Sequence, residues 1–316
     1  MYRPTHITGI FGALILMLCI QASHADNATW KRHPQSGDWN TKTNWTPAHV
    51  PNGSAGVATF ALSNNTSVSI SANTEVSGIT FTSAATSPYT ISESTGLTFT
   101  VSGTGITNNS ATLQTFVTGP VPFGEHWAAG RIVFSNSATA GANIAYVNNG
   151  TFGFEGNEMI FKNNSTGGSA YISNLGVMQF LDRSTAGSAY IENEYGGFIQ
   201  FAGQSTAGTA GILDFTGSGL LFRERSTAGN ATIGAYDSGY FQFSDSASAG
   251  NATIYTYSDS RFDGHSTAGN ATITVGDVGF GGSIIFTDFS TGGTAAITLL
   301  PSLPGVGAPS WRWIIM

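Results

Sequence analysis

A short string that recurs through the second half of the chain restricts its fold more than any other feature. Ser-Thr-Ala-Gly or Ser-Thr-Gly-Gly occurs six times, and two variants extend the series to eight. The eight strings begin at Ala138, Ser165, Ser184, Ser205, Ser226, Ala247, Ser266 and Ser290. A phenylalanine stands four residues before each start: Phe134, Phe161, Phe180, Phe201, Phe222, Phe243, Phe262 and Phe286. The steps between these phenylalanines are 19 to 27 residues, which indicates a structural repeat.

Apolar side chains recur at a spacing of two on both sides of each string. The residue two before each phenylalanine is apolar except at Ser260, and Ala and Ile stand two apart afterwards, as at Ala231 and Ile233. This spacing is typical of strands whose alternate side chains face one interior. A unit of about 20 residues cannot bury its apolar face alone, so equivalent strands should pair in parallel from unit to unit. We therefore predict an all-β protein, a single-stranded parallel β-helix, with Phe222 buried between Phe201 and Phe243.

The repeat divides the chain into regions. It is regular over 131–300, and short β-branched or aromatic runs between polar turns predict earlier, irregular coils over 57–130. The segment Gly119–Gly124 interrupts these coils and could be a loop insertion or a joint between two domains. Residues 301–316 lack the string, and we interpret them as a non-repeat tail.

The first 25 residues predict export. A short polar start is followed by an apolar run from Ile7 to Ile20 and by small residues at Ser23 and Ala25. This pattern is typical of a secretory signal peptide cleaved after Ala25, since the run is short for the roughly 20 residues of a membrane anchor. The expected mature chain is secreted or displayed at the cell surface, has no membrane-spanning segment, and loses the single cysteine, so it can form no disulfide.

Composition excludes some classes of function. The net charge of −7 argues against nucleic-acid binding, which requires a basic surface. Charged residues make up 9% of the chain, so candidate acids, bases and metal ligands are few. The expected mature chain has four scattered histidines, no two of them at metal-ligand spacing, and we expect neither a metal nor a cofactor.

Residues 26–56 are rich in tryptophan, with Trp30, Trp39 and Trp45 among Gly, Asn and Pro. The end of a solenoid exposes unpaired strand edges, which natural proteins cover. We predict that this segment caps the first coil. The competing interpretation is an exposed aromatic site for sugars.

The pattern Trp30, Gly37-Asp38-Trp39-Asn40, Asn44-Trp45 and Pro51, followed by strands and Gly-Ser-Thr-Ala-rich coils, resembles a family of secreted bacterial β-helix proteins. It is similar to the passenger region of autotransporter-type proteins with autotransporter-associated β-strand repeats. The resemblance implies export and surface display, often as an adhesin or a stalk. The chain departs from that family after Leu300, where no C-terminal membrane barrel follows in this sequence.

One group of ionisable residues is a candidate site. Its members should stack on one outer side of the solenoid: Arg223, Glu224, Arg225, Asp245, Arg261, Asp263 and His265. Many β-helix enzymes that cut acidic polysaccharides place Asp, Arg and His on such a face, and acid–base chemistry there would need two carboxylates at a fixed separation. The alternative is a solvated set of compensating charges at the turns.

A row of threonines is a second candidate. Thr232, Thr253 and Thr272 should face outward in successive coils beside Asn230, Asn251 and Asn270, with Gly211 and Ala296 interrupting the row. Stacked Asn and Thr can satisfy one another along a β-helix, whereas a flat Thr array could order water or bind ice.

From the sequence we expect an exported, non-enzymatic β-helix that acts as a surface adhesin or structural stalk, with host or cell-surface glycans or proteins as partners. The alternative is a carbohydrate-active enzyme, a polysaccharide lyase or hydrolase that uses the residues from Arg223 to His265.

Overall fold

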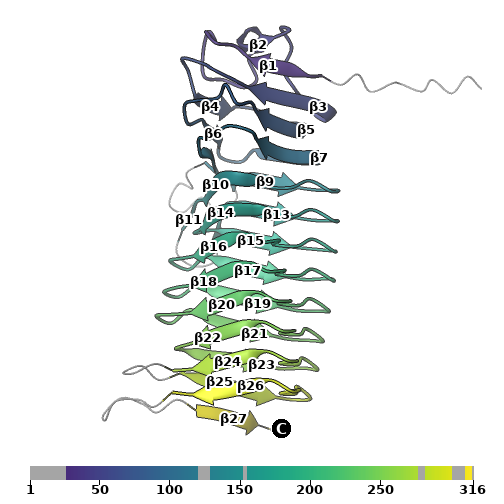
Figure 1. Cartoon of the computed structure of the whole chain (residues 1–316), viewed down its shortest axis with the longest axis vertical. Helices are drawn as coiled ribbons and strands as arrows, with labels where there is room; N and C mark the ends of the chain where they lie inside the picture. The colour runs from purple at the N-terminus through teal and green to yellow at the C-terminus, as the bar shows by residue number, and fades with distance from the viewer. Residues whose placement is uncertain (1–25, 120–128, 152–154, 277–281, 301–309, 315–316) are drawn as a thin grey trace, which may run out of the picture.

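The chain folds into a long parallel β-solenoid with two main sheets (Figure 1). The computed structural model describes residues 26–119, 129–151, 155–276, 282–300 and 310–314. It contains about ten turns with coils of about 22 residues, which confirms the predicted fold class. The signal peptide, the Pro120–Gly124 loop and most of the predicted tail lie outside the described residues.

Among the described residues, sheet A has fourteen strands, and each strand pairs with the next in the spatial order of the sheet. That order is β2 (Trp45–Thr46), β1 (Ala28–Trp30), β3 (Gly53–Phe60), β5 (Thr74–Phe81), β7 (Thr98–Asn108), β9 (Arg131–Phe134), β13 (Glu158–Phe161), β15 (Val177–Phe180), β17 (Phe198–Phe201), β19 (Gly219–Phe222), β21 (Tyr240–Phe243), β23 (Asp259–Phe262), β25 (Ser283–Thr287) and β27 (Ser310–Ile314). All pairs in sheet A are parallel except β1 with β2.

Sheet B has eleven strands within the described ranges, all paired in parallel. They are β4 (Ser67–Ile70), β6 (Thr90–Glu93), β8 (Gln114–Val117), β10 (Ala142–Asn148), β14 (Ser169–Asn174), β16 (Tyr190–Asn193), β18 (Gly211–Asp214), β20 (Thr232–Ala235), β22 (Thr253–Thr256), β24 (Thr272–Val275) and β26 (Ala296–Leu299). Two short strands, β11 (Gly150–Thr151) and β12 (Glu155–Gly156), form a separate antiparallel pair, and Lys42–Asn44 is a 3-10 helix.

A third, shorter row joins the coils between the two sheets. The second residue of the recurring string forms single parallel bridges from Thr139 through Thr166, Thr185, Thr206, Thr227, Ser248 and Thr267 to Thr291. The residues of the string therefore form one side of each coil. The string recurs because every coil needs the same short segment at that side.

The phenylalanines form one continuous interior stack, as predicted. From Phe134 to Phe286 the ring centroids of neighbouring coils are 4.5–4.9 Å apart and nearly parallel. Every ring in this phenylalanine column is buried, and the neighbouring side chain of Arg223 is exposed. Centroid distances of this size lie within the range in which aromatic rings attract each other, so the coil spacing itself sets up favourable ring contacts.

The interior side of sheet B contains a polar column. Asn148, Asn174, Asn193 and Asp214 occupy the same register in four successive strands and are fully buried. Each Asn Nδ2 donates to the next side-chain Oδ1, at 2.7, 2.7 and 2.6 Å. We call this set the amide column, and it continues in later coils as Ala235, Thr256 and Val275.

The tryptophans at the N-terminal end pack on the first phenylalanine of the interior. Trp30, Trp39 and Trp45 are buried, and their ring centroids lie 5.6–6.1 Å from that of Phe60. Their indole N–H groups donate to backbone carbonyl oxygens of Asn65, Pro51 and Trp39, respectively. Because their rings are buried, they do not form an exposed aromatic site for sugars.

One strand extends sheet A beyond the repeat. Residues Ser310–Ile314, which the sequence assigned to the non-repeat tail, form β27 and pair in parallel with β25. Sequence reasoning missed this strand because residues 301–316 lack the recurring string. The string forms the third row of each coil, and a strand of sheet A can form without it.

Candidate functional site

Six residues of the predicted ionic group lie in the turns that lead from sheet A to the third row, and Arg261 lies in β23, just before one of these turns. Arg223, Glu224, Arg225, Asp245, Arg261 and His265 are exposed, and Asp263 is half-buried. The structure thus brings the seven residues to one side of three successive coils, as predicted. Four of these side chains, those of Glu224, Asp245, Arg261 and Asp263, bind backbone or side-chain groups of the same and neighbouring coils.

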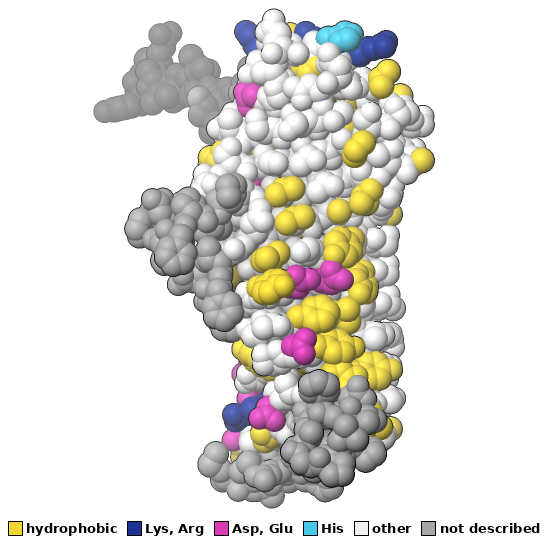
Figure 2. Space-filling model, turned by 90° about the vertical axis from the view of Figure 1, so that its left-hand side faces the viewer, with side chains coloured by type: hydrophobic (Ala, Val, Ile, Leu, Met, Phe, Trp, Pro, Cys, Tyr) yellow, Lys and Arg dark blue, Asp and Glu magenta, His cyan; other side chains and the backbone are white. Residues whose placement is uncertain are grey.

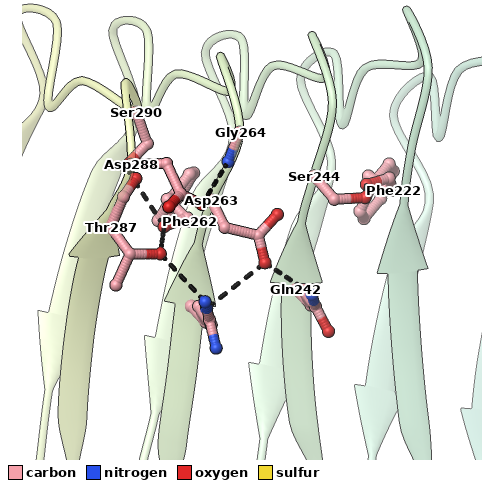
Figure 3. A network of polar contacts seen from close by, with 10 residues as sticks. Phe222, Gln242, Ser244, Phe262, Asp263, Gly264, Thr287, Asp288 and Ser290 are labelled. Atoms are coloured by element: carbon pink, nitrogen blue, oxygen red, sulfur yellow. Dashed lines mark hydrogen bonds and ion pairs between the residues drawn. The ribbon is translucent and has the colours of Figure 1, made fainter. Parts of the chain in front are cut away.

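The acidic side chains of these turns serve as caps for the neighbouring coil. Glu224 and Asp245 have φ values of 61° and 53°, in the left-handed region. The backbone N–H of Gly203 donates to the Glu224 carboxylate at 2.8 Å, and that of Glu224 donates to Asp245 at 2.9 Å. Asp288 accepts from Gly264 in the same way at 3.2 Å (Figure 3). These carboxylates satisfy backbone donors that the left-handed turn leaves without a strand partner.

Arg261 and Asp263 form a compact network with Gln242 and Thr287 (Figure 3). Asp263 Oδ2 accepts from Gln242 Nε2 at 2.7 Å and lies 3.2 Å from Arg261 Nε. Arg261 also donates to the Thr287 hydroxyl at 3.0 Å, and the His265 ring stacks on that of Phe289, with centroids 5.0 Å apart. A mutually paired cluster of this kind favours the structural interpretation over acid–base chemistry.

The threonine row has the predicted register. Thr232, Thr253 and Thr272 are adjacent in successive strands, with Gly211 before them and Ala296 after them. Beside them, Asn251 accepts from Asn270 at 3.1 Å and donates to Asn230 at 3.2 Å. The three asparagines therefore form an exposed ladder.

Neither a metal site nor a membrane helix is found in the described part of the chain. No group of three or more His, Cys, Asp or Glu residues there could hold a metal ion. No helix among the described residues is long and apolar enough to cross a membrane.

Sequence reasoning did not single out the exposed aromatic rings on the outer side of sheet B. Tyr171 and Tyr190 lie in register on β14 and β16, with ring centroids 6.0 Å apart, and are 40% and 44% exposed. Figure 2 views this flank and shows hydrophobic side chains gathered along its middle with acidic side chains among them. We call this surface the tyrosine face; it comprises Tyr171, Tyr190, Glu192, Glu194, Tyr195, Phe215, Tyr236, Asp237, Tyr255 and Tyr257.

Glycines let two of these rings lie close to the sheet. A Cβ atom at Gly234 would lie 2.4 Å from the ring of Tyr236, and one at Gly211 would lie 3.1 Å from the ring of Tyr190. A side chain at position 234 would displace the Tyr236 ring. Because Gly234 has no side chain, the ring can lie directly over the backbone. A second stack of rings lies along the face. The ring centroid of Tyr236 is 5.6 Å from that of Phe215 and 5.0 Å from that of Tyr257.

The tyrosine face is electrostatically negative. In the part of the chain that the structure describes, none of the eleven strands of sheet B contains Lys or Arg. The Tyr171 hydroxyl donates to the Glu192 carboxylate. This hydrogen bond, together with burial and the nearby charges of Glu192 and Glu194, raises the pKa of Tyr171 to about 12. Ionisation of the phenol is disfavoured because the carboxylates already supply negative charge.

A hollow of about 220 Å³ opens within the tyrosine face. Its walls are two carboxylates, Glu194 and Asp237, two aromatic rings, Tyr195 and Phe215, and Thr216. Tyr195 is 61% exposed. A larger, shallow groove of about 690 Å³ follows the glycines of the third row and is lined by small and uncharged side chains, such as Thr139, Ser188 and Thr209.

No protein-family model, no curated protein and no solved structure matches this chain. The resemblance to autotransporter passengers therefore stays a prediction, and functional inference depends on the geometry of the molecule.

Proposed function

We propose that the chain is an exported, non-enzymatic solenoid that acts in attachment, as a surface adhesin or as a structural stalk. The observation that carries this proposal is the tyrosine face, which has aromatic rings in five successive coils from β14 to β22. Four of these rings are exposed and three are half-buried: Tyr171, Tyr190, Tyr195 and Tyr255, and Phe215, Tyr236 and Tyr257, respectively. Exposed apolar patches with polar surroundings are typical of interaction sites.

The fold supports attachment because it holds that face rigid. Each strand of the regular coils hydrogen bonds to a strand on either side, and the stacked interior resists shear between coils. A rod of this kind displays a binding surface at a distance from its point of anchorage, which is what an adhesin or a stalk requires.

The ionic network supports a non-enzymatic role. Glu224 and Asp245 cap backbone N–H groups, and Asp263 is paired with Arg261 and Gln242. Such carboxylates are committed to the turns of the solenoid, whereas glycoside chemistry requires one as acid and one as base or nucleophile.

Adhesion and catalysis can be tested on one preparation. The full chain is expressed with a secretion machinery, and the product is coupled to beads that are offered insoluble polysaccharides and protein-coated surfaces. We expect retention above that of bare beads, and no reducing ends released from a panel of acidic polysaccharides. Retention equal to that of bare beads, or release that Asp263→Ala abolishes, would contradict the proposal.

Export is tested on the same product. Cleavage after Ala25 gives a chain that begins at Asp26. N-terminal sequencing that finds Met1 on exported protein would contradict the predicted signal peptide.

A further inference from the structure

We propose that the tyrosine face binds an extended amino-sugar chain, whose pyranose rings stack on the tyrosines and whose ammonium groups meet Glu192, Glu194 and Asp237. This inference rests on the proposed attachment function and names the chemistry of its ligand.

The charge of the face selects a cationic ligand. Its ionisable side chains other than tyrosine are all acidic, and the strands of sheet B provide no Lys or Arg to receive a carboxylate or sulfate. The hollow lined by Glu194, Asp237, Tyr195 and Phe215 combines two carboxylates with two aromatic rings. An ammonium group is attracted both by carboxylates and by aromatic ring faces.

The shape of the face favours a sugar chain over a peptide. Strands β14–β22 are hydrogen-bonded on both sides, so their backbone cannot take up an added peptide strand. The Tyr236 ring lies over Gly234 and the Tyr190 ring extends toward Gly211, so these rings lie along the sheet. The flat, apolar C–H side of a pyranose ring suits this arrangement, while its hydroxyl groups stay hydrated.

The extent of the face suits an oligomer. Aromatic residues occur in each of the five coils from β14 to β22, which at roughly 4.8 Å per step extend over about 19 Å. The face has two stacks: Tyr190 lies at the start of β16, whereas Phe215 and Tyr236 follow the ends of β18 and β20. A ligand that crosses from the first stack to the second meets Tyr190 and Glu192 in one coil and Phe215 and Tyr236 in the next two. We therefore expect a chain of several sugars to bind more tightly than a single sugar.

The test measures binding of a glucosamine hexamer by calorimetry, in buffer acidic enough to protonate its amines. Its N-acetylated counterpart should bind at least about tenfold more weakly, since it lacks the ammonium groups. Added salt should weaken the binding of the glucosamine hexamer, because the charges lie at the surface.

Variants of the face separate its two contributions. Tyr190→Ala and the pair Glu192→Gln with Glu194→Gln should each weaken binding about tenfold, whereas Tyr190→Phe keeps the ring and should retain binding. Phe289→Ala is the matched control: Phe289 is an aromatic residue 73% exposed, and it stacks on His265 outside the face. Circular dichroism of each variant verifies that the solenoid is intact.

Three results would overturn the inference: equal binding of the two hexamers, equal binding of a hexalysine peptide, or no binding of the glucosamine hexamer. If beads coated with the protein still adhere, only the assignment of the ligand fails. If they do not adhere either, the proposed attachment function fails with it.

Discussion

The two sheets of this solenoid fill the same interior in different ways. Sheet A contributes the phenylalanine column, in which each ring contacts the ring above and the ring below at 4.5–4.9 Å. Sheet B contributes the amide column, in which each Asn donates to the next and the series ends at Asp214. One column is stabilised by burial of apolar area, and the other by hydrogen bonds between buried polar groups, although Asp214 Oδ2 at its end is buried without a hydrogen-bond partner.

The difference has an energetic consequence. Removing a ring leaves a cavity whose effect depends on volume. Removing an amide leaves neighbouring side chains with buried donors and acceptors that have no partner. The loss of stability then depends on how many hydrogen bonds these groups lose. Each column can therefore be probed by a substitution that leaves the other intact.

The largest effect is expected in the phenylalanine column. Phe222→Ala should lower the free energy of unfolding by about 3–5 kcal/mol, because the ring is buried between Phe201 and Phe243. Urea unfolding followed by circular dichroism measures the change. An effect below about 1 kcal/mol would show that the column is not part of the interior.

The acid that ends the amide column predicts a pH dependence. Burial raises the pKa of Asp214 to about 7, although Asn193 and Ser218 donate hydrogen bonds to it. Its ordinary pKa is 3.8, so the folded protein binds the proton more tightly than the unfolded chain. The contribution of Asp214 to stability is complete below pH 3.8 and is lost as the pH rises through about 7.

Asp214→Asn removes this dependence while keeping the shape of the side chain. The difference in unfolding free energy between wild type and variant should change by on the order of 3 kcal/mol from pH 4 to pH 8, in favour of the variant at high pH. Glu93, whose pKa burial also raises to about 7, is present in both proteins and cancels in the difference. A constant difference over this pH range would contradict the assignment.

The interior of the amide column provides a smaller effect. Asn193→Ala should cost about 1–3 kcal/mol, since the partners on either side, Asn174 and Asp214, lose a buried hydrogen bond. The matched control is Asn251→Ala in the exposed ladder, where water replaces the lost contacts and the change should stay within about 0.5 kcal/mol. Chemical denaturation of the two variants compares a buried with an exposed asparagine ladder, and equal losses would refute the distinction.

Sequence reasoning predicted one of the two columns. Phenylalanine recurs at a fixed offset from the string, so the column of sheet A was visible as a repeat of one residue type. The amide column was missed because Asn174 and Asn193 look like turn residues, although the alternation that buries Ile172 and Ile191 places them inward as well. Hydrogen bonds between the asparagine side chains of adjacent coils make their burial possible. Such bonds join two units of the repeat, so they cannot be recognised from the sequence of one unit.

The candidate sites show the same limit. The sequence predicted that the residues from Arg223 to His265 stack on one side, but not that Glu224 and Asp245 accept from the backbone, which depends on their left-handed φ values. The tyrosine face was missed because its aromatic residues stand at several different offsets from the string, unlike the phenylalanines of the interior. Only the register of β14–β22 brings Tyr190 next to Gly211.

Hydrogen exchange of Phe222→Ala and Arg223→Ala tests the central claim, that interior columns transmit stability between neighbouring coils. Phe222 is buried and Arg223, the next residue, is exposed. Since coils stabilise their nearest neighbours, exchange in Phe222→Ala should accelerate first over 205–246 and leave the tryptophan-packed region around Phe60 protected longer. Arg223→Ala should exchange like wild type and cost about 0.5 kcal/mol or less. Equal acceleration in the two variants, or acceleration spread uniformly along the chain in Phe222→Ala, would contradict this account.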